Sequence, residues 1–382
     1  MKFDWTSEQL EYRERVIEFA QHELDHAVVQ GDRECTFPRE NWNRCAAFGI
    51  QGLSLPAKYN GKDDVDFMTA ILAMEGLGYG CEDNGLTFAL NAQMWTVQLP
   101  LLQYGSEALC ERYLPAMSRG ELIGAHAISE AESGSDVFNM RSRADRCNGG
   151  YVLNGRKCFV SLLQVADLAL VFALTDPSAG KWGVSAFVIE VGSDGASVGD
   201  NQEKMGLRTV PFGDLVLIDC FVPEENRLGP EGAGVSLSTS FLEWERCSIL
   251  ASQVGTMQRQ LEQTIEYARQ RKQFGKAIGK HQAVAKRIVD MKLRLETSRL
   301  LLYQTAWLKA SGKSAMMEAA LLKLYLGEAF VESSLDAIRV HGGRGYVTEN
   351  GIERNLRDAV GGTIYAGTSD IQRNIVASLL GL

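Results

Sequence analysis

The side chains best suited to acid–base chemistry in this chain are two carboxylates, Glu243 and Glu245. Glu245 lies nearly opposite the apolar stripe of a predicted helix, at about 100° per residue, and precedes a face of small and polar residues. A carboxylate beside such a face is directed at something other than core packing. For either glutamate alone, a first-turn acid that complements the helix dipole is the better explanation. The assignment therefore depends on the rest of the chain.

The element that must position Glu245 is predicted from apolar residues that recur at three- and four-residue steps from Cys247 to Ala268. Ser240 followed by Glu243 forms the pattern of a capping box, which predicts a helix beginning there. The sequence thus places Glu245 near a helix start.

Composition limits the classes of protein to consider. With 382 residues, 45% of them hydrophobic, the chain can form two or three domains with ample cores. A formal net charge of −9 without a basic tail argues against nucleic-acid binding. No long apolar run predicts a membrane span, and the charged N-terminus is unlike a secretion signal. The eight cysteines form no C-x-x-C pair or zinc spacing. We expect buried, reduced thiols in a cytoplasmic protein without metal.

Helix and strand signals divide the chain into three domains and give an α+β fold class. We expect an N-terminal α-helical domain over residues 1–122, a middle β domain, as a small barrel or sandwich, over 123–233, and a C-terminal α-helical bundle over 234–382.

Local signals place individual elements. A capping box at Thr6 predicts the first helix, Pro38 and Gly49 bound a second, and Asp63 or Asp64 is expected to begin a third. In the middle domain, Asn148-Gly149 and Asn154-Gly155 are hairpin signals. Strands are expected over 168–174, 184–191 and 214–222.

The segment EYARQRKQFGKAIGKHQ, which follows the Glu245 helix, closely resembles the Arg-x-x-Phe-Gly and His-Gln segments of the acyl-CoA dehydrogenase family. The resemblance extends over nearly all 382 residues and includes the order of helices, sheet and helices. It implies a helical bundle fold, a bound FAD and a homotetramer or homodimer.

Two segments of the β domain, HAISEAESGSD and FVSL, resemble family segments that meet the flavin. Hydroxyl and backbone N–H groups suit the flavin carbonyls, where negative charge grows on reduction. The residues carried over by this resemblance are Ser129, Ser135, Phe159 and Ser161. The chain departs from the family pattern at His126, Ala131 and Leu162.

Three later segments resemble segments that contact FAD in this family. In family members the first of them, which here contains Arg271, contacts the FAD of a neighbouring subunit. The pyrophosphate partner implied by the resemblance is Arg271, whose guanidinium is a charge-assisted donor. The cofactor-binding residues implied by these segments are Arg271, Phe274, Gln282, Arg339, Gly343, Thr368 and Asp370. Arg339 and Asp370 stand where the family more usually has Gln.

The resemblance also assigns the catalytic base. Many family members carry a catalytic Glu at the position of Ala366, whereas other branches carry it on the earlier helix, directly before an Arg, as in Glu245-Arg246. A second carboxylate in one dry pocket would repel the first and raise its pKa. Glu245 with Ala366 is therefore a coherent pair. The implied substrate-binding residues are Glu243, Arg246 and Ala366.

We therefore expect an oxidoreductase that removes hydrogen from a CH–CH bond of an acyl thioester, with FAD as hydride acceptor. FLEWER and AKRIVDMKLRLE are most similar to the branch that oxidises prolyl or other acyl groups on carrier proteins in biosynthesis. A free acyl-CoA is the alternative substrate. An electron-transfer flavoprotein would accept the electrons. A flavin oxidase and a catalytically silent binding protein remain as other classes.

Overall fold

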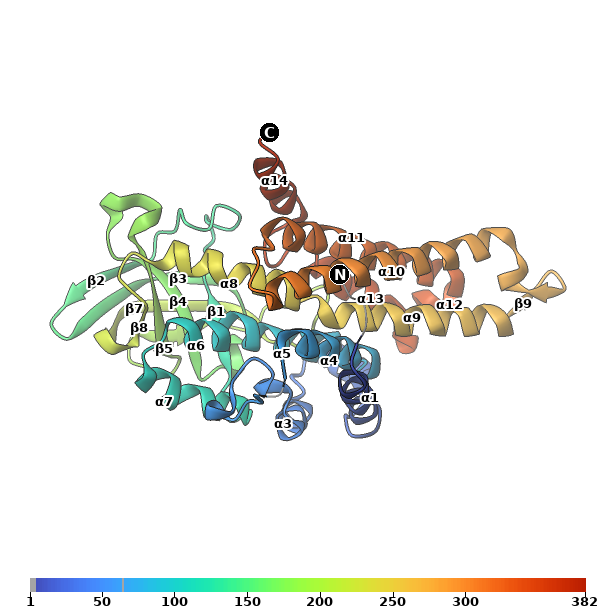
Figure 1. The fold of residues 1–382 in the computed structure, drawn as a ribbon, viewed down its shortest axis with the longest axis horizontal. Coiled ribbons are helices and arrows are strands. Elements are labelled where there is room, and N and C mark those ends of the chain that lie inside the picture. The colour runs from blue at the N-terminus through green and yellow to red at the C-terminus, as the bar shows by residue number, and fades with distance from the viewer. Residues whose placement is uncertain (1–4, 64) are drawn as a thin grey trace.

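The computed structural model describes residues 5–63 and 65–382. Helices, sheet and helices follow one another as predicted, which confirms the α+β fold class (Figure 1). The sheet lies at one end of the molecule and the long C-terminal helices at the other, with the N-terminal helices along one side. The N-terminal elements are α1 (Ser7–His22), α2 (Val28–Glu34), α3 (Arg39–Phe48), α4 (Phe67–Gly80), α5 (Asn84–Gln93), a π-helical turn (Met94–Gln98), α6 (Leu99–Tyr104) and α7 (Glu107–Ser118).

The first two predicted helix starts are confirmed. Thr6 and Gln9 exchange side-chain and backbone hydrogen bonds, so the capping box of α1 is present. Helix α3 ends at Gly49, whose φ of 98° suits a residue without a Cβ.

The start predicted for the third helix is wrong. Asp66, not Asp63, caps α4, because its carboxylate accepts a hydrogen bond from the backbone N–H of Thr69 at 2.7 Å. Asp63 instead accepts one from the backbone N–H of Ala57 at 2.8 Å. Asp64, the other candidate, lies outside the described residues.

The middle of the chain forms one mixed sheet, in the strand order β6-β7-β3-β2-β4-β5-β8, with β1 parallel to β4. The buried faces of β4 and β5 explain why their sequences are continuously apolar. The strands are β1 (Gly124–Ala127), β2 (Arg143–Cys147), β3 (Gly150–Ser161), β4 (Leu168–Leu174), β5 (Val184–Glu190), β6 (Ala196–Val198), β7 (Phe212–Pro223) and β8 (Arg227–Leu228).

Only one of the two Asn-Gly signals makes a hairpin in the described residues. Asn148 and Gly149 join β2 to β3, with Cys147 opposite Gly150 in the ladder. Asn154-Gly155 lies inside β3, so that prediction is wrong. The register against β7 shifts there, and a Cβ on Gly155 would stand 2.2 Å from Oγ of Ser142. This glycine therefore serves a bulge and a close approach.

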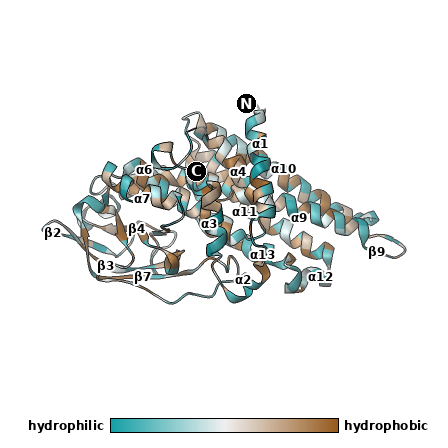
Figure 2. Ribbon diagram, turned by 90° about the horizontal axis from the view of Figure 1, so that it is seen from below, coloured by the Kyte–Doolittle hydropathy of each residue, from teal (hydrophilic) through white to brown (hydrophobic). Residues whose placement is uncertain are grey.

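The C-terminal part is dominated by four long helices, which pack on one another. Helices α9 and α10 extend side by side to the hairpin β9–β10 at the tip (Figure 1). Hydrophobic and hydrophilic residues alternate along both (Figure 2). The elements are α8 (Gly234–Ser248), α9 (Ala251–Gln270), β9 (Lys272–Gln273), β10 (Lys276–Ala277), α10 (Gln282–Ala310), α11 (Met316–His341), α12 (Gly343–Tyr346), α13 (Ile352–Gly361) and α14 (Ser369–Leu379).

The capping box predicted at Ser240 is also wrong. Helix α8 already begins at Gly234, which leaves Ser240 exposed within the helix. The apolar period is then interrupted at Ile249 and Leu250, where α8 ends and α9 begins. Glu245 consequently lies in the last turn of α8, at the negative end of its dipole, rather than near a helix start.

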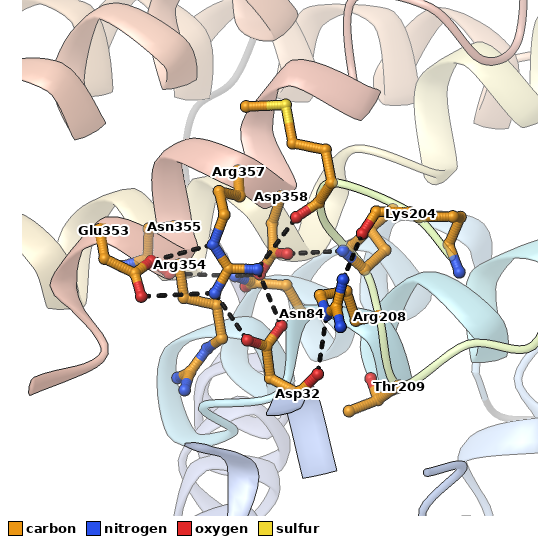
Figure 3. A network of polar contacts seen from close by, with 12 residues as sticks. Asp32, Asn84, Lys204, Arg208, Thr209, Glu353, Arg354, Asn355, Arg357 and Asp358 are labelled. Atoms are coloured by element: carbon orange, nitrogen blue, oxygen red, sulfur yellow. Dashed lines mark hydrogen bonds and ion pairs between the residues drawn. The ribbon is translucent and has the colours of Figure 1, made fainter. Parts of the chain in front are cut away.

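One polar network joins all three parts of the chain (Figure 3). Arg357 of α13 forms an ion pair with Asp32 of α2, with nitrogen–oxygen distances of 2.6 and 3.0 Å. Asp358 accepts hydrogen bonds from the backbone N–H of Leu207 and from Asn84 of α5. The network holds the 203–209 loop of the middle part against α13.

Three further observations concern the whole chain. In the described residues, no helix is long and apolar enough to cross a membrane. Within the same ranges, no group of three His, Cys, Asp or Glu residues is placed to hold a metal ion. The cysteines are free thiols; six of them are buried, Cys35 is partly exposed and Cys147 is exposed.

Candidate active site

Glu245 is buried at the end of α8, with 8% of its surface exposed. Burial raises the pKa of its carboxyl to about 7, while Arg246 and Lys323 act in the opposite direction. Among the described residues, none donates a hydrogen bond to this carboxylate. A carboxylate that titrates near neutrality is suited to accept a proton from carbon.

Near Glu245 lies the turn that contains Tyr365 and Ala366. Both side chains pack against the same apolar cluster as Leu250. The hydroxyl of Tyr365 accepts a hydrogen bond from Gln253 of α9 at 2.8 Å, and Glu245 and Asp358 contribute to raising its pKa beyond the effect of burial. The turn is therefore fixed to α9 beside the base.

The backbone at Ala366 is held in an unusual conformation. Its φ is 55°, in the left-handed region, and Gln372 donates hydrogen bonds to the carbonyls of Ala366 and Gly367 at 3.1 and 2.9 Å. Within the described residues, the backbone N–H of Ala366 donates to no other group. A fixed, unpaired N–H is suited to receive a developing oxyanion.

The two charged neighbours of Glu245 differ. Glu243 is bonded to Lys309 of α10 at 2.9 Å, and the same ammonium lies 4.6 Å from the ring centroid of Trp244. Arg246 is buried, and its Nε has no partner among the described residues. The structure thus engages Glu243 in a contact between helices, while Arg246 keeps a free donor near the base.

Three of the residues carried over on the β domain lie on strand β3 or next to it, and the fourth lies in a loop. Phe159, 60% exposed with a φ of 60°, stacks on Phe212 with ring centroids 5.9 Å apart. Ser161 ends the same strand, β3, and the carbonyl of Ser129 accepts a hydrogen bond from the N–H of Cys158 in that strand. Ser135 is exposed in the loop that follows β1.

A second group lies at the far end of the long helices (Figure 1). Arg271 ends α9, Phe274 is 93% exposed in the β9–β10 hairpin, and Gln282 begins α10. Arg339 and Gly343 lie close by at the end of α11, because Tyr267 of α9 stacks on His341 at 4.4 Å. Arg339 is bonded to Asp336.

The last two cofactor-binding residues implied by the family resemblance, Thr368 and Asp370, lie just after Ala366, at the start of α14. The hydroxyl of Thr368 caps α14 by accepting from the N–H of Ile371 at 3.2 Å. Asp370 is exposed and pairs with Arg373 at 3.1 Å. Ser369, between them, has a buried hydroxyl with no partner among the described residues.

The donors and rings in these groups fit a flavin nucleotide. Phe159 and Phe274 are large aromatic side chains held away from the core by positive φ angles. Arg271 is exposed and offers a charged donor for a phosphate. The β-domain group and the hairpin group lie at opposite ends of one chain (Figure 1).

Sequence reasoning missed Lys323, Gln253 and Tyr365 as parts of this site. Lys323 lies in the run LLKLYL, where a single lysine is normally expected to extend toward solvent. Instead it is fully buried, and its Nζ lies 5.9 Å from the ring centroid of Tyr365. The signal that could have drawn attention to it is a lysine between apolar residues on both helical faces.

Comparisons with known proteins agree with the order of the three domains. The family models of the N-terminal, middle and C-terminal domains of acyl-CoA dehydrogenase match residues 6–121, 125–220 and 232–381, respectively. An L-prolyl-[peptidyl-carrier protein] dehydrogenase of Pseudomonas fluorescens is 41% identical over the full length of both chains.

Solved structures are equally similar. The crystal structure of the prolyl acyl carrier protein oxidase AnaB superposes with a TM-score of 0.97 at 46% identity, covering 99% of this chain and 100% of that one. The structure of PigA with FAD and proline has a TM-score of 0.97 at 38% identity and full coverage of both chains.

Proposed function

Since this chain belongs to the acyl-CoA dehydrogenase family, and is an FAD-dependent oxidoreductase acting on CH–CH bonds, we propose that its substrate is a prolyl or similar acyl group held as a thioester on a carrier protein. The observation that carries this proposal is the full-length similarity to a prolyl-carrier dehydrogenase, together with a buried Glu245 near the turn of Tyr365 and an alanine at position 366. A free acyl-CoA is the alternative substrate.

Glu245 is the base in this proposal. Its carboxylate removes the proton α to the thioester carbonyl, and burial gives it a pKa of about 7, close to the working pH. Ala366 leaves room where a second carboxylate would repel the first. Arg246 and Glu243 are proposed to order the base or the arm of the carrier, Glu243 through its contact with Lys309.

The N–H of Ala366 stabilises the negative charge that develops on the thioester oxygen as the α-proton leaves. The α-proton is too weakly acidic for a carboxylate unless the carbonyl is polarised. The hydrogen bonds from Gln372 support this role, because they hold the turn in the conformation that leaves the Ala366 N–H free.

The flavin supplies the hydride acceptor when it is bound. Ser129, Ser135, Phe159 and Ser161 would contact its ring from the β domain, with Thr368 and Asp370 near the substrate turn. Arg271, Phe274, Gln282, Arg339 and Gly343 would hold its pyrophosphate end in a second subunit. The distance between these two groups along one chain supports the cross-subunit arrangement (Figure 1).

The remaining proposals concern the whole protein. We infer a homotetramer, or a homodimer at least, in the cytoplasm, with an electron-transfer flavoprotein as electron acceptor. We propose domain boundaries between residues 122 and 123, just before β1, and between residues 233 and 234, at the start of α8.

The test of substrate class is anaerobic bleaching of the bound flavin. Prolyl and other aminoacyl or acyl groups are presented as carrier-protein thioesters and as CoA thioesters at low salt. Faster bleaching by a carrier-tethered group supports the proposal. Equal or faster bleaching by the matching CoA ester contradicts the carrier and favours a free acyl-CoA.

A second candidate is a flavin oxidase, favoured by the similarity to a protein described as an oxidase. The two functions share the proton abstraction and differ in the electron acceptor. Oxygen consumption during turnover without any added acceptor identifies the oxidase, whereas dependence on an added acceptor identifies the dehydrogenase.

A further inference from the structure

Lys323 is a buried charge beside the proposed base that the reaction described above does not use. It lies within α11 with 0% of its surface exposed, and its Nζ has no hydrogen-bond partner among the described residues. An ammonium carries three donors, and burying it without an acceptor is costly. A nearby negative charge would stabilise its charged form, and Glu245 acts in that direction.

The groups that face Lys323 come from several elements. From α8 come Glu245 and Arg246, which both act on its charge. From the turn comes Tyr365, whose ring centroid is 5.9 Å from Nζ. Along α11 itself the nearest acid is Glu328, which is already paired with Arg373 of α14 at 2.6 Å.

The acids behind these groups are engaged as well. Asp358 of α13 acts on Tyr365, and it accepts from the Leu207 N–H and from Asn84. Gln253 of α9 is neutral and donates to Tyr365. Of the acids that face Lys323 in the described residues, Glu245 is thus the one without an ion-pair or hydrogen-bond partner of its own.

We propose that Lys323 is a positioning residue for the base: its buried ammonium keeps the carboxylate of Glu245 ionised and directed into the pocket, ready to take the α-proton. The proposal rests on the proposed function, in which Glu245 is that base. Lys323 itself does not touch the substrate.

Electrostatics agree with this geometry. Burial alone favours the neutral form of each group, so it raises the pKa of Glu245 and lowers that of Lys323 to about 8. Each group opposes that effect on the other. Together with Arg246, Lys323 places two positive charges around one carboxylate, which favours the ionised base.

The test compares neutral and charged replacements over pH 6 to 9.5, with anaerobic flavin reduction by substrate as the readout. A plot of rate against pH should rise on its acid side as Glu245 becomes ionised, and we call this rise the acid limb. In Lys323→Met we expect the acid limb to move up by about one pH unit. The rate then falls ~10-fold at pH 6 and comes within about twofold of wild type at pH 9.5, where Glu245 is ionised in both proteins. Lys323→Arg should keep the limb near its wild-type position.

Lys309→Met is the matched control, because Lys309 is a partly buried lysine that faces Glu243 instead of Glu245. It should leave the position of the limb unchanged. If Lys323→Met fails to fold or loses FAD, Lys323→Gln, a neutral and polar variant, takes its place with the same expected shift.

A second readout does not depend on turnover. The protonated carboxyl of Glu245 is followed by infrared difference spectra between the holoenzyme and Glu245→Gln, as a function of pH. Removing the charge of Lys323 should move the loss of this band to higher pH. An unmoved limb and band, or a loss of rate that is equal at all pH values, overturns the proposal.

The two proposals fail in different ways. If Glu245→Gln reduces its flavin at the wild-type rate, Glu245 is not the base and the proposed function fails. The infrared band would still report whether Lys323 controls the ionisation of Glu245, because that measurement needs no substrate.

Discussion

At the scale of single residues, the feature that matters most is a carboxylate in a place where its charge is unfavourable. Glu245 is buried at the C-terminal end of α8, and both burial and the helix dipole favour its neutral form. Such groups are typical of functional sites, where stability is given up for a group with the pKa that the reaction needs.

This burial predicts a pH-dependent effect of Glu245→Gln on stability. The folded pKa of Glu245 is about 7, above the 4.5 of an ordinary glutamate, so its contribution to the stability of the fold is fully present below pH 4.5 and is lost as the pH rises through 7. The amide does not titrate. We expect the free energy of unfolding of the variant to exceed that of wild type by an amount that grows from pH 5 to pH 8 and reaches about 3 kcal/mol. This corresponds to a melting temperature that is higher by roughly 3 °C.

Calorimetry of both holoenzymes at the two pH values measures the effect. A difference in melting temperature that stays constant with pH would mean that Glu245 titrates in the folded protein as it does in water.

Glu245 could be selected from the sequence as the proposed base, whereas its surroundings could not be predicted. Glu245-Arg246 and Ala366 are recognisable as a pair, because the chain lacks a carboxylate at position 366 and carries one at position 245. Lys323 is not recognisable, because a lysine in an apolar helix is equally compatible with a side chain that reaches solvent, and only packing decides between the two.

At the scale of secondary structure elements, short-range signals were reliable where side chain and backbone satisfy each other locally, as at Thr6. They failed where a competing cap or packing prevailed. Asp66 caps α4 in place of Asp63, and α8 begins at Gly234 without a side-chain cap, so that Ser240 is internal. Asn154-Gly155 marks a bulge and not a hairpin. The glycine is needed there because Ser142, from a different segment, approaches it closely, and a local sequence signal does not show this.

The Asp32–Arg357 ion pair, which fixes α13 and the 203–209 loop, predicts a difference between two acid-to-amide substitutions. Asp32 and Arg357 are 14% and 23% exposed, and Arg357 donates two hydrogen bonds to the carboxylate. We expect Asp32→Asn to lower the free energy of unfolding by about 1–3 kcal/mol.

The control for that substitution is Glu328→Gln, which breaks the exposed pair with Arg373. We expect a cost below about 1 kcal/mol there. Equal costs in parallel denaturation experiments would show that the junction is not held by this ion pair.

At the scale of the whole molecule, one chain presents surfaces that are suited to a neighbour. Helix α10 exposes Val289, Leu293 and Leu300 by 64, 63 and 52%, and the hairpin exposes Phe274. Helix α14 projects from the body and ends in exposed leucines (Figure 1). The order of helices and sheet was predictable from periodicity, but the separation of the two FAD-binding groups required the fold.

The cross-subunit arrangement predicts that Arg271→Ala loses FAD more readily than Arg269→Ala. Both arginines are exposed near the end of α9, so Arg269 is a matched control. Arg259 would be a poor one, because it is partly buried and donates to the carbonyls of Gly78, Tyr79 and Cys81. The FAD content after gel filtration, together with the mass from light scattering, measures the effect.

Leu293→Asp extends that experiment by weakening the apolar surface instead of the phosphate contact. We expect smaller assemblies with less FAD, because the pyrophosphate site would be divided. A monomeric wild-type protein that retains its FAD, or equal retention by both arginine variants, would contradict the arrangement.

The most direct test of the whole account is the rate of anaerobic flavin reduction in Glu245→Gln, followed as loss of the yellow absorption band after mixing with the thioester that reduces the wild-type enzyme. The amide is nearly isosteric with the carboxylate and should leave fold and FAD binding intact, but it cannot accept the α-proton. We predict a rate lower by about 10²–10⁴-fold at pH 8. Reduction at the wild-type rate would show that the base lies elsewhere.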